Sequence, residues 1–168
     1  MYKVLDICQY IIKYCNNKNY EITNLKLQPL LYYIQLYFLS VKYEKCFEED
    51  VVAWDAFPAV KEAFRGYKCY GALHIYNHRT YVIDKNNLFN SHYEEFNENI
   101  ISEEDKALIN EVIEEHVNQD SQEIRERVSR ESPYRDAIHK GIGTIIPLEY
   151  YAFTYRPKKI IEKRGKSC

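Results

Sequence analysis

Cys69, His74 and His78 are the residues of this sequence whose types and spacing come closest to a metal site. They follow a C-x4-H-x3-H pattern, and Cys46 is a candidate fourth ligand. Zinc fingers carry a ligand pair at each end of a loop. Only the histidine pair fits that scheme, and a turn at Asn77 would place the two histidines on different strands. Surface histidines and a buried thiol are the favoured interpretation, so we expect no bound metal.

No other arrangement of side chains in the sequence indicates an enzyme. The chain lacks GxSxG, HExxH, GxxxxGK[ST] and GxGxxG motifs. Cys8 and Cys15 fall on the apolar face of a predicted helix, where a thiol behaves as a small hydrophobic group. Glu48, Glu49 and Asp50 form an acidic cluster that we expect to contact only water. The sequence therefore predicts no catalytic residues and no cofactor.

Length and composition favour one folded domain. The chain has 168 residues, of which 46% are hydrophobic and 29% charged, and this excludes overall disorder. The net charge of −2 excludes a polycation, and the 17 tyrosines are unusually many. No apolar run reaches the roughly 18 residues of a membrane span, and the N-terminus does not resemble a signal peptide. We therefore expect a cytoplasmic protein whose five cysteines are thiols.

Helices are predicted for the first 41 residues. The second helix is expected to begin after Thr23 as the N-cap and to end near Val41, and it is apolar almost all round, which places it at the centre of the core. Pro29 predicts either a kink in this helix or a restart at that residue. The first helix is predicted over residues 2–16, with an apolar face formed by Val4, Cys8, Ile11, Ile12 and Cys15.

The middle of the chain shows shorter patterns. A turn at residues 55–58 is expected to lead into a helix over about residues 59–68, and residues 84–101 to be irregular. Leu73, Ile75, Tyr81 and Ile83 alternate around a polar centre at residues 77–79, which predicts a small β-hairpin over residues 72–83.

Capping residues mark the helices of the second half. Ser102 is the expected N-cap of one helix, and Asp120 or Ser121 of the next, with Ile124 and Val128 facing inward. Ser132-Pro133 should end that helix, residues 134–138 should form a short turn or helix, and a last short helix should cover residues 146–155. The inner face of the helix after Ser102 is predicted to contain Ala107, Leu108, Val112, Ile113, and His116 or Val117.

These patterns predict a mainly α fold: a single compact helical domain over residues 1–155 with a small β-hairpin insertion. Residues 156–168 form a basic tail with six basic residues and one acidic residue. Residues 94–126 contain twelve acidic residues and two basic ones, and we interpret them as the solvated face of two helices. Because the tail carries no folded motif and an acidic face would repel a duplex, nucleic acid is not an expected partner.

Three segments resemble, in this order, one protein family. Residues 23–33 (TNLKLQPLLYY), 53–60 (AWDAFPAV) and 131–137 (ESPYRDA) are similar to the T-x-L-K-L-Q-K-L-L-Y-Y, A-W-x-y-G-P-V and E-x-P-W-x-x-A segments of the SocA-like, or Panacea, domain. The resemblance covers about residues 3–155. Pro29 replaces the usual Lys, Phe57 stands in place of Gly, and Tyr134 replaces Trp. Since Phe57 does not readily adopt the positive φ open to glycine, we expect the turn there to be either rebuilt or differently used.

The resemblance implies a mostly helical domain that occurs in phage-associated genes and as the antitoxin of bacterial toxin–antitoxin pairs. Such antitoxins neutralise a toxin by direct contact, and one member is an adaptor that delivers its toxin to a protease. We therefore predict an antitoxin-like, non-enzymatic protein whose partner is a cognate toxin, with a protease or chaperone as a further partner if it acts as an adaptor. The alternative is a small metal- or thiol-dependent hydrolase that uses Cys69, His74 and His78.

The matching segments also supply the candidate site residues, as partner-binding or structural positions. Core or turn roles are favoured for the leucines, Trp54 and Pro58. We expect Trp54 to pack on the second helix and to shape a groove with Tyr33 and Tyr134. The full candidate set is Leu27, Gln28, Tyr33, Trp54, Phe57, Pro58, Pro133 and Tyr134.

Overall fold

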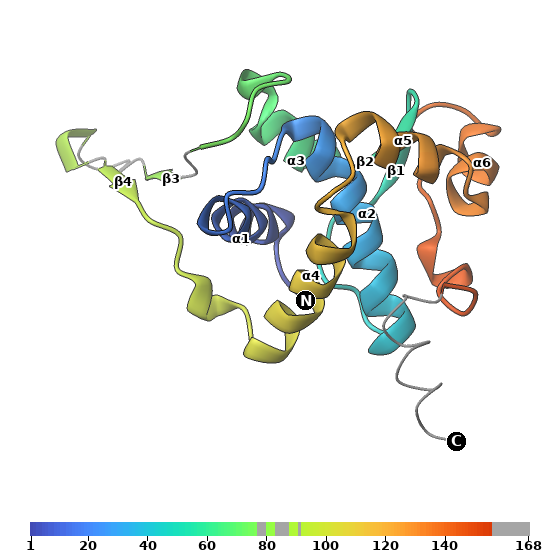
Figure 1. Ribbon diagram of the computed structural model, residues 1–168, viewed down its shortest axis with the longest axis horizontal. Helices are drawn as coiled ribbons and strands as arrows, with labels where there is room; N and C mark the ends of the chain where they lie inside the picture. The colour runs from blue at the N-terminus through green and yellow to red at the C-terminus, as the bar shows by residue number, and fades with distance from the viewer. Residues whose placement is uncertain (77–79, 83–87, 91, 156–168) are drawn as a thin grey trace.

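Helix α2 (Asn24–Val41) runs through the middle of the molecule in the computed structural model, with the other helices placed around it (Figure 1). The structure describes residues 1–76, 80–82, 88–90 and 92–155. Fifteen of the eighteen residues of α2 are buried, as expected for a helix that is apolar almost all round. Thr23 is its N-cap, and the Thr23 hydroxyl accepts the Lys26 amide at 3.2 Å. The helix continues through Pro29, so it does not restart there.

Helices α1 (Val4–Asn17), α3 (Lys61–Gly66), α4 (Glu103–His116), α5 (Ser121–Ser129) and α6 (Ser132–Ile138) surround α2. All five residues of the predicted apolar face of α1 are buried. Ser102 caps α4 as predicted, and Asp120 forms a capping box at the start of α5. The inner face of α4 differs from the prediction, because Ile109 is buried while Ala107 is exposed.

Two short antiparallel hairpins complete the described elements. Strands β1 (Val52–Trp54) and β2 (Phe57–Ala59) pair through Val52–Ala59, Ala53–Pro58 and Trp54–Phe57, where the sequence predicted a turn and the start of a helix. Strands β3 (Thr80–Val82) and β4 (His92–Glu94) lie at the end of an arm that extends from the helices (Figure 1). The fold is therefore mainly α with a small hairpin, as predicted.

The position of the predicted hairpin is wrong. Residues 72–83 do not pair with one another in the described part, because Thr80–Val82 pairs with His92–Glu94 instead. His74 forms an isolated antiparallel bridge with Thr23, and the Ile75 amide donates to the Ile22 carbonyl at 2.9 Å. The polar centre at 77–79 lies outside the described residues. The paired residues of β3 and β4 are 10 to 14 positions apart, so no short-range alternation marks this hairpin in the sequence.

Single 3-10 turns occupy four further positions: η1 (Lys68–Tyr70), η2 (Leu88–Asn90), η3 (Glu98–Ile100) and η4 (Leu148–Tyr150). The last helix predicted over residues 146–155 is only η4, followed by turns that end at residue 154. The basic tail, 156–168, lies outside the described residues. Across the described ranges, no helix combines the length and the apolarity needed to cross a bilayer.

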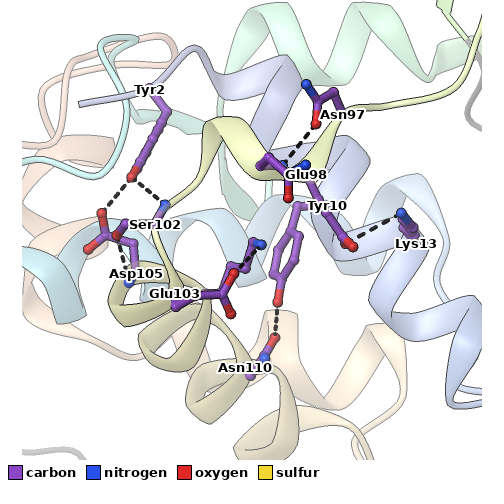
Figure 2. Close-up of polar contacts among 11 residues, drawn as sticks. Tyr2, Tyr10, Lys13, Asn97, Glu98, Ser102, Glu103, Asp105 and Asn110 are labelled. Atoms are coloured by element: carbon purple, nitrogen blue, oxygen red, sulfur yellow. Dashed lines mark hydrogen bonds and ion pairs between the residues drawn. The ribbon is translucent and has the colours of Figure 1, made fainter.

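Tyrosine hydroxyls join α4 to α1, α2 and the N-terminus. Figure 2 shows two of these contacts: Tyr2 donates to Asp105 at 2.6 Å, and Tyr10 to Asn110 at 2.9 Å. Burial favours a raised pKa for Asp105, but its hydrogen bonds, chiefly those from Lys42 and Tyr2, hold that pKa below its usual value. We use the name tyrosine seam for two sets of hydrogen bonds. The first set joins α4 to Tyr2, Tyr10, Tyr14, Tyr20 and Tyr37, and the second joins Glu131 to Tyr32 and Tyr33.

Candidate partner-binding surface

Gln28 of α2 holds the junction between β2 and α3. Its side-chain oxygen accepts the Val60 amide at 3.0 Å, and its nitrogen donates to Asn24 at 2.9 Å. Asn24 in turn donates to the Phe64 carbonyl at 3.1 Å. Gln28 is fully buried, so these bonds satisfy polar groups that water does not reach. Gln28 therefore acts as a structural clamp in this fold, and Leu27 beside it is also fully buried.

Phe57 does not carry the positive φ of the β1–β2 turn. The positive φ of this turn, 64°, belongs to Ala56, while Phe57 lies in β2 and pairs with Trp54. The Phe57 ring is nearly buried, with the Arg125 guanidinium 4.9 Å above its centroid. A bulky side chain thus occupies the family's glycine position, because the left-handed residue is one place earlier in the chain. Pro58 is buried in β2, opposite Ala53.

Glu131, the N-cap of α6, organises the aromatic residues of α2. Its two carboxylate oxygens accept the hydroxyls of Tyr32 and Tyr33, each at 2.7 Å. Burial first, and then the charge of Glu131, raise the pKa of both tyrosines well above the usual value. The Tyr33 ring stacks on His116 with centroids 4.4 Å apart, and the Arg127 guanidinium lies 5.4 Å from its centroid. Tyr33 is therefore an internal residue.

Pro133 and Tyr134 fix α6 against the hairpin. Pro133 lies in the first turn of α6, where its missing amide hydrogen costs no helical hydrogen bond. The Tyr134 hydroxyl donates to the Trp54 carbonyl at 2.8 Å. Both side chains are buried. The three matching segments of the sequence thus meet around the β1–β2 hairpin, and seven of the eight candidate residues are buried there.

Trp54 is the exception, and it corrects the expectation of a buried indole. Its side chain is 38% exposed, and the Lys61 ammonium lies 6.0 Å from the ring centroid. Trp54, Tyr33 and Tyr134 do not form the predicted groove. The Tyr33 hydroxyl points to Glu131, and Tyr134 contacts the Trp54 backbone. Any role of the eight residues in partner binding stays a prediction.

A third extended segment lies beside β1 on the side away from β2. The Gly143 amide donates to the Ala53 carbonyl at 2.7 Å, and Val52 bridges Ile145 in antiparallel fashion. Ile142 and Ile145 are both more than half exposed. We call residues 142–146 the β1 edge segment. The apolar Ile142 between Gly141 and Gly143 was the available signal for this segment in the sequence.

A cavity of about 600 Å³ adjoins this segment. Its apolar floor includes Val52 and Val60, and Lys61 contributes from the start of α3. A side chain at Gly143 would lie 3.8 Å from the Lys61 nitrogen, so the ammonium group is close to both Gly143 and the Trp54 ring. The full lining is Glu49, Asp50, Val52, Val60, Lys61, Glu62, Arg65, Gly143 and Ile145.

The candidate metal ligands have other surroundings. Cys69 is exposed on η1, which corrects the expected buried thiol. His74 accepts the Ile22 amide through Nδ1 at 3.0 Å, so that nitrogen has a structural partner. His78 lies outside the described residues, and Cys46 is buried near Gln35. Among the described residues, no group of three or more His, Cys, Asp or Glu side chains is placed to hold a metal ion.

The other residues considered for catalysis, the acidic cluster and the cysteines of α1, also have structural surroundings that explain them. Glu49 of the acidic cluster accepts the Val4 amide at 2.9 Å, and it thereby caps α1 in place of Lys3, which forms no side-chain cap. Burial raises the pKa of the Cys15 thiol to about 12 and raises that of Cys8 as well. Both thiols are therefore protonated at neutral pH, as expected for residues of an apolar helix face.

Comparison with known families agrees with this geometry. The model of the family described as antitoxin SocA-like, Panacea domain, matches residues 27–134, which is more than half of the chain. The chain therefore belongs to this family. The matched region begins in α2 and ends in α6, so it contains the clamp at Gln28, the β1–β2 hairpin and Glu131. No curated protein and no solved structure was found to match the chain.

Proposed function

We propose that this chain is an antitoxin that neutralises a cognate toxin by direct protein–protein binding, without catalysing a reaction. Membership of the SocA-like antitoxin family, with residues 27–134 matched, is the observation that carries the proposal. The contacts of the candidate residues support it, because the matched segments build a rigid frame around the β1–β2 hairpin. A frame of this kind presents a fixed surface, which lowers the entropic cost of binding a partner.

The surface charge supports the same function. Glu103 and Glu104 at the start of α4 are exposed, and so are Glu123 and Glu126 of α5. A negative face attracts a basic partner at long range and increases the rate of encounter more than the affinity itself. We infer that the acidic face guides the toxin, while a different, more apolar surface holds it.

The proposal includes the setting of the protein. The antitoxin would act in the cytoplasm and be encoded in a phage- or prophage-associated gene pair. Its domain would extend to about residue 155, beyond the matched residues 27–134, since Ala152 still belongs to the apolar core. In the adaptor variant of the proposal, the chain would also contact a protease or chaperone and deliver the toxin to it.

Co-expression with the neighbouring open reading frame tests the proposal. Induction of the neighbour alone should stop growth, and the full chain supplied in trans should restore growth. The two proteins should then co-purify and elute together from a sizing column. A neighbour that is harmless alone, or a toxic one that the chain neither binds nor neutralises, would overturn the proposal. Toxin levels that fall only when a host protease is present would identify the adaptor variant.

A further inference from the structure

We propose that the toxin docks on the β1 edge segment, residues 142–146, by adding an extended segment of its own beside Ile145. This inference rests on the proposed function, because it names the surface by which the antitoxin would hold its toxin. It stands on three features of the same few residues: backbone groups that have no hydrogen-bond partner in the described part of the chain, exposed apolar side chains next to a cavity, and charges of opposite sign at the two ends of the segment.

The backbone of Ile145 faces away from β1. In the antiparallel bridge between Val52 and Ile145, the ladder bonds come from the flanking residues: the Ala53 amide donates to Thr144 at 2.8 Å, and the Ile146 amide donates to Val51 at 2.9 Å. The amide and carbonyl of Ile145 consequently point to the outer side of the segment. Within the described ranges they have no hydrogen-bond partner. An extended chain is the partner that satisfies both groups at once.

Exposed apolar side chains adjoin these backbone groups. Ile145 is 53% exposed, and Ile142 and Trp54 add further apolar surface from neighbouring positions. Below Ile145, the 600 Å³ cavity offers Val52 and Val60 as an apolar floor. An apolar side chain on the incoming segment would fill that cavity, and large apolar groups in such pockets contribute most of the affinity of many interfaces.

The charges at the two ends of the segment specify the occupant further. Lys61 lies at the Gly143 end, next to the Trp54 ring. Glu49 and Asp50 line both the large cavity and a second one that reaches Pro147, so they lie toward the other end. Lys45 in the second cavity is paired with Glu149 at 3.1 Å, and Glu62 and Arg65 add one charge of each sign to the large cavity. The toxin segment should therefore carry an acidic residue near Lys61, an apolar residue opposite Ile145, and a basic residue near Asp50.

The test compares two isoleucine-to-lysine variants of the full chain, with the purified product of the neighbouring gene as the probe. Ile145→Lys places a charge on the docking segment, whereas Ile100→Lys changes an isoleucine of similar exposure, 47%, on the distant η3 turn. We expect Ile145→Lys to raise the Kd for the toxin at least about tenfold, and Ile100→Lys to leave it within about twofold. Thermal unfolding of both variants verifies that they are folded.

Hydrogen exchange gives an independent readout that needs no variant. In the complex, the Ile145 amide should exchange at least about tenfold more slowly than in the free chain, because it becomes a ladder donor. If wild-type chain binds the toxin but Ile145 stays unprotected and Ile145→Lys binds normally, the docking surface is wrong while the antitoxin function stands. Protection of Ile145 that depends on the concentration of the chain alone would show a second copy as the occupant, and would also overturn the inference. A neighbour that is not neutralised at all refutes the function, and this inference with it.

Discussion

The tyrosine seam and the β1 edge segment use their polar groups in opposite ways. In the seam, each tyrosine hydroxyl bonds to a carboxylate or amide side chain 74 to 103 residues away, as when Tyr14 and Tyr20 both donate to Glu114. At the edge segment, the Ile145 backbone has no hydrogen-bond partner among the described residues, and the side chains of Ile142 and Ile145 are more than half exposed. The polar side chains of the seam hydrogen-bond to one another within the chain. At the edge segment, the amide and carbonyl of Ile145 are available to bind a partner.

This difference separates the residues that make the fold from those that can act on a partner. The seam tyrosines are buried or half-buried, and removing one of them leaves its partner without that hydrogen bond. Edge residues can change with little effect on stability, and their changes should appear in binding instead. The two regions can thus be tested by comparing unfolding with function in the same variants.

Alkaline pH should have the largest effect, because it acts on the whole seam at once. Burial, followed by the neighbouring carboxylates, raises the pKa of Tyr14, Tyr32, Tyr33 and Tyr37 above the value of about 10 in an unfolded chain. Their contribution to stability is therefore complete below about pH 10 and is lost as the pH rises above it, at up to about 1.4 kcal/mol per pH unit for each of Tyr32 and Tyr33. The loss is smaller for Tyr14 and Tyr37, because solvent screens their more accessible hydroxyls. As the pH rises, tyrosinate absorbance should increase over the same pH range in which the helical circular dichroism signal is lost. If these tyrosines ionise while the chain stays helical, the claim that the tyrosine seam stabilises the fold is contradicted.

Replacing Glu131 with alanine should give the largest effect of a single substitution. The change leaves two buried hydroxyls, those of Tyr32 and Tyr33, without acceptors. We expect Glu131→Ala to lower the free energy of unfolding by about 3 kcal/mol in urea titration. Glu104→Ala removes an exposed carboxylate of α4 and should change it by less than about 0.5 kcal/mol. Equal effects of the two substitutions would remove the distinction between seam and surface.

A smaller gain is expected at the hairpin turn. Ala56 has a φ of 64°, a region that is costly for alanine and open to glycine. Ala56→Gly should therefore raise the free energy of unfolding by about 1 kcal/mol. Ala72→Gly, in an exposed turn with ordinary φ, serves as the control and should lower it slightly. Destabilisation by Ala56→Gly would show that Ala56 does not adopt this conformation in solution.

The smallest effect on stability is expected at the edge segment. Ile145→Lys should change the free energy of unfolding by less than about 0.5 kcal/mol, since the side chain is more than half exposed. The adjacent Ile146 is 3% exposed, so Ile146→Lys should cost about 3 kcal/mol or more. Similar costs at the two positions would mean that the segment does not alternate between solvent and core as described.

Sequence patterns predicted the elements whose signals are local. The N-caps Thr23, Ser102 and Asp120 lie within three residues of the amides that they accept, so they could be read directly. The family motifs identified residues that do meet in space. The contacts they make could not be predicted, because Tyr33 and Glu131 are 98 residues apart and either could have pointed to solvent.

The exposed surface was the least predictable part. Trp54 reads as a core residue by type, yet it alternates with the buried Ala53 on a strand only three residues long. A strand this short has no detectable period. Its partner strand, β2, contains Pro58, and proline is disfavoured within strands, so the sequence did not indicate β2 either. The edge segment depends on hydrogen bonds to β1 from residues some ninety positions later, which no local pattern records.

Growth rescue by Ile145→Lys, measured beside its thermal unfolding, tests the central claim most directly. Cells that express the neighbouring toxin should grow with wild-type chain and with Ile100→Lys. They should not grow with Ile145→Lys, although this variant accumulates and unfolds at the wild-type temperature. Full rescue by a folded Ile145→Lys would contradict the claim that this antitoxin holds its toxin at the β1 edge.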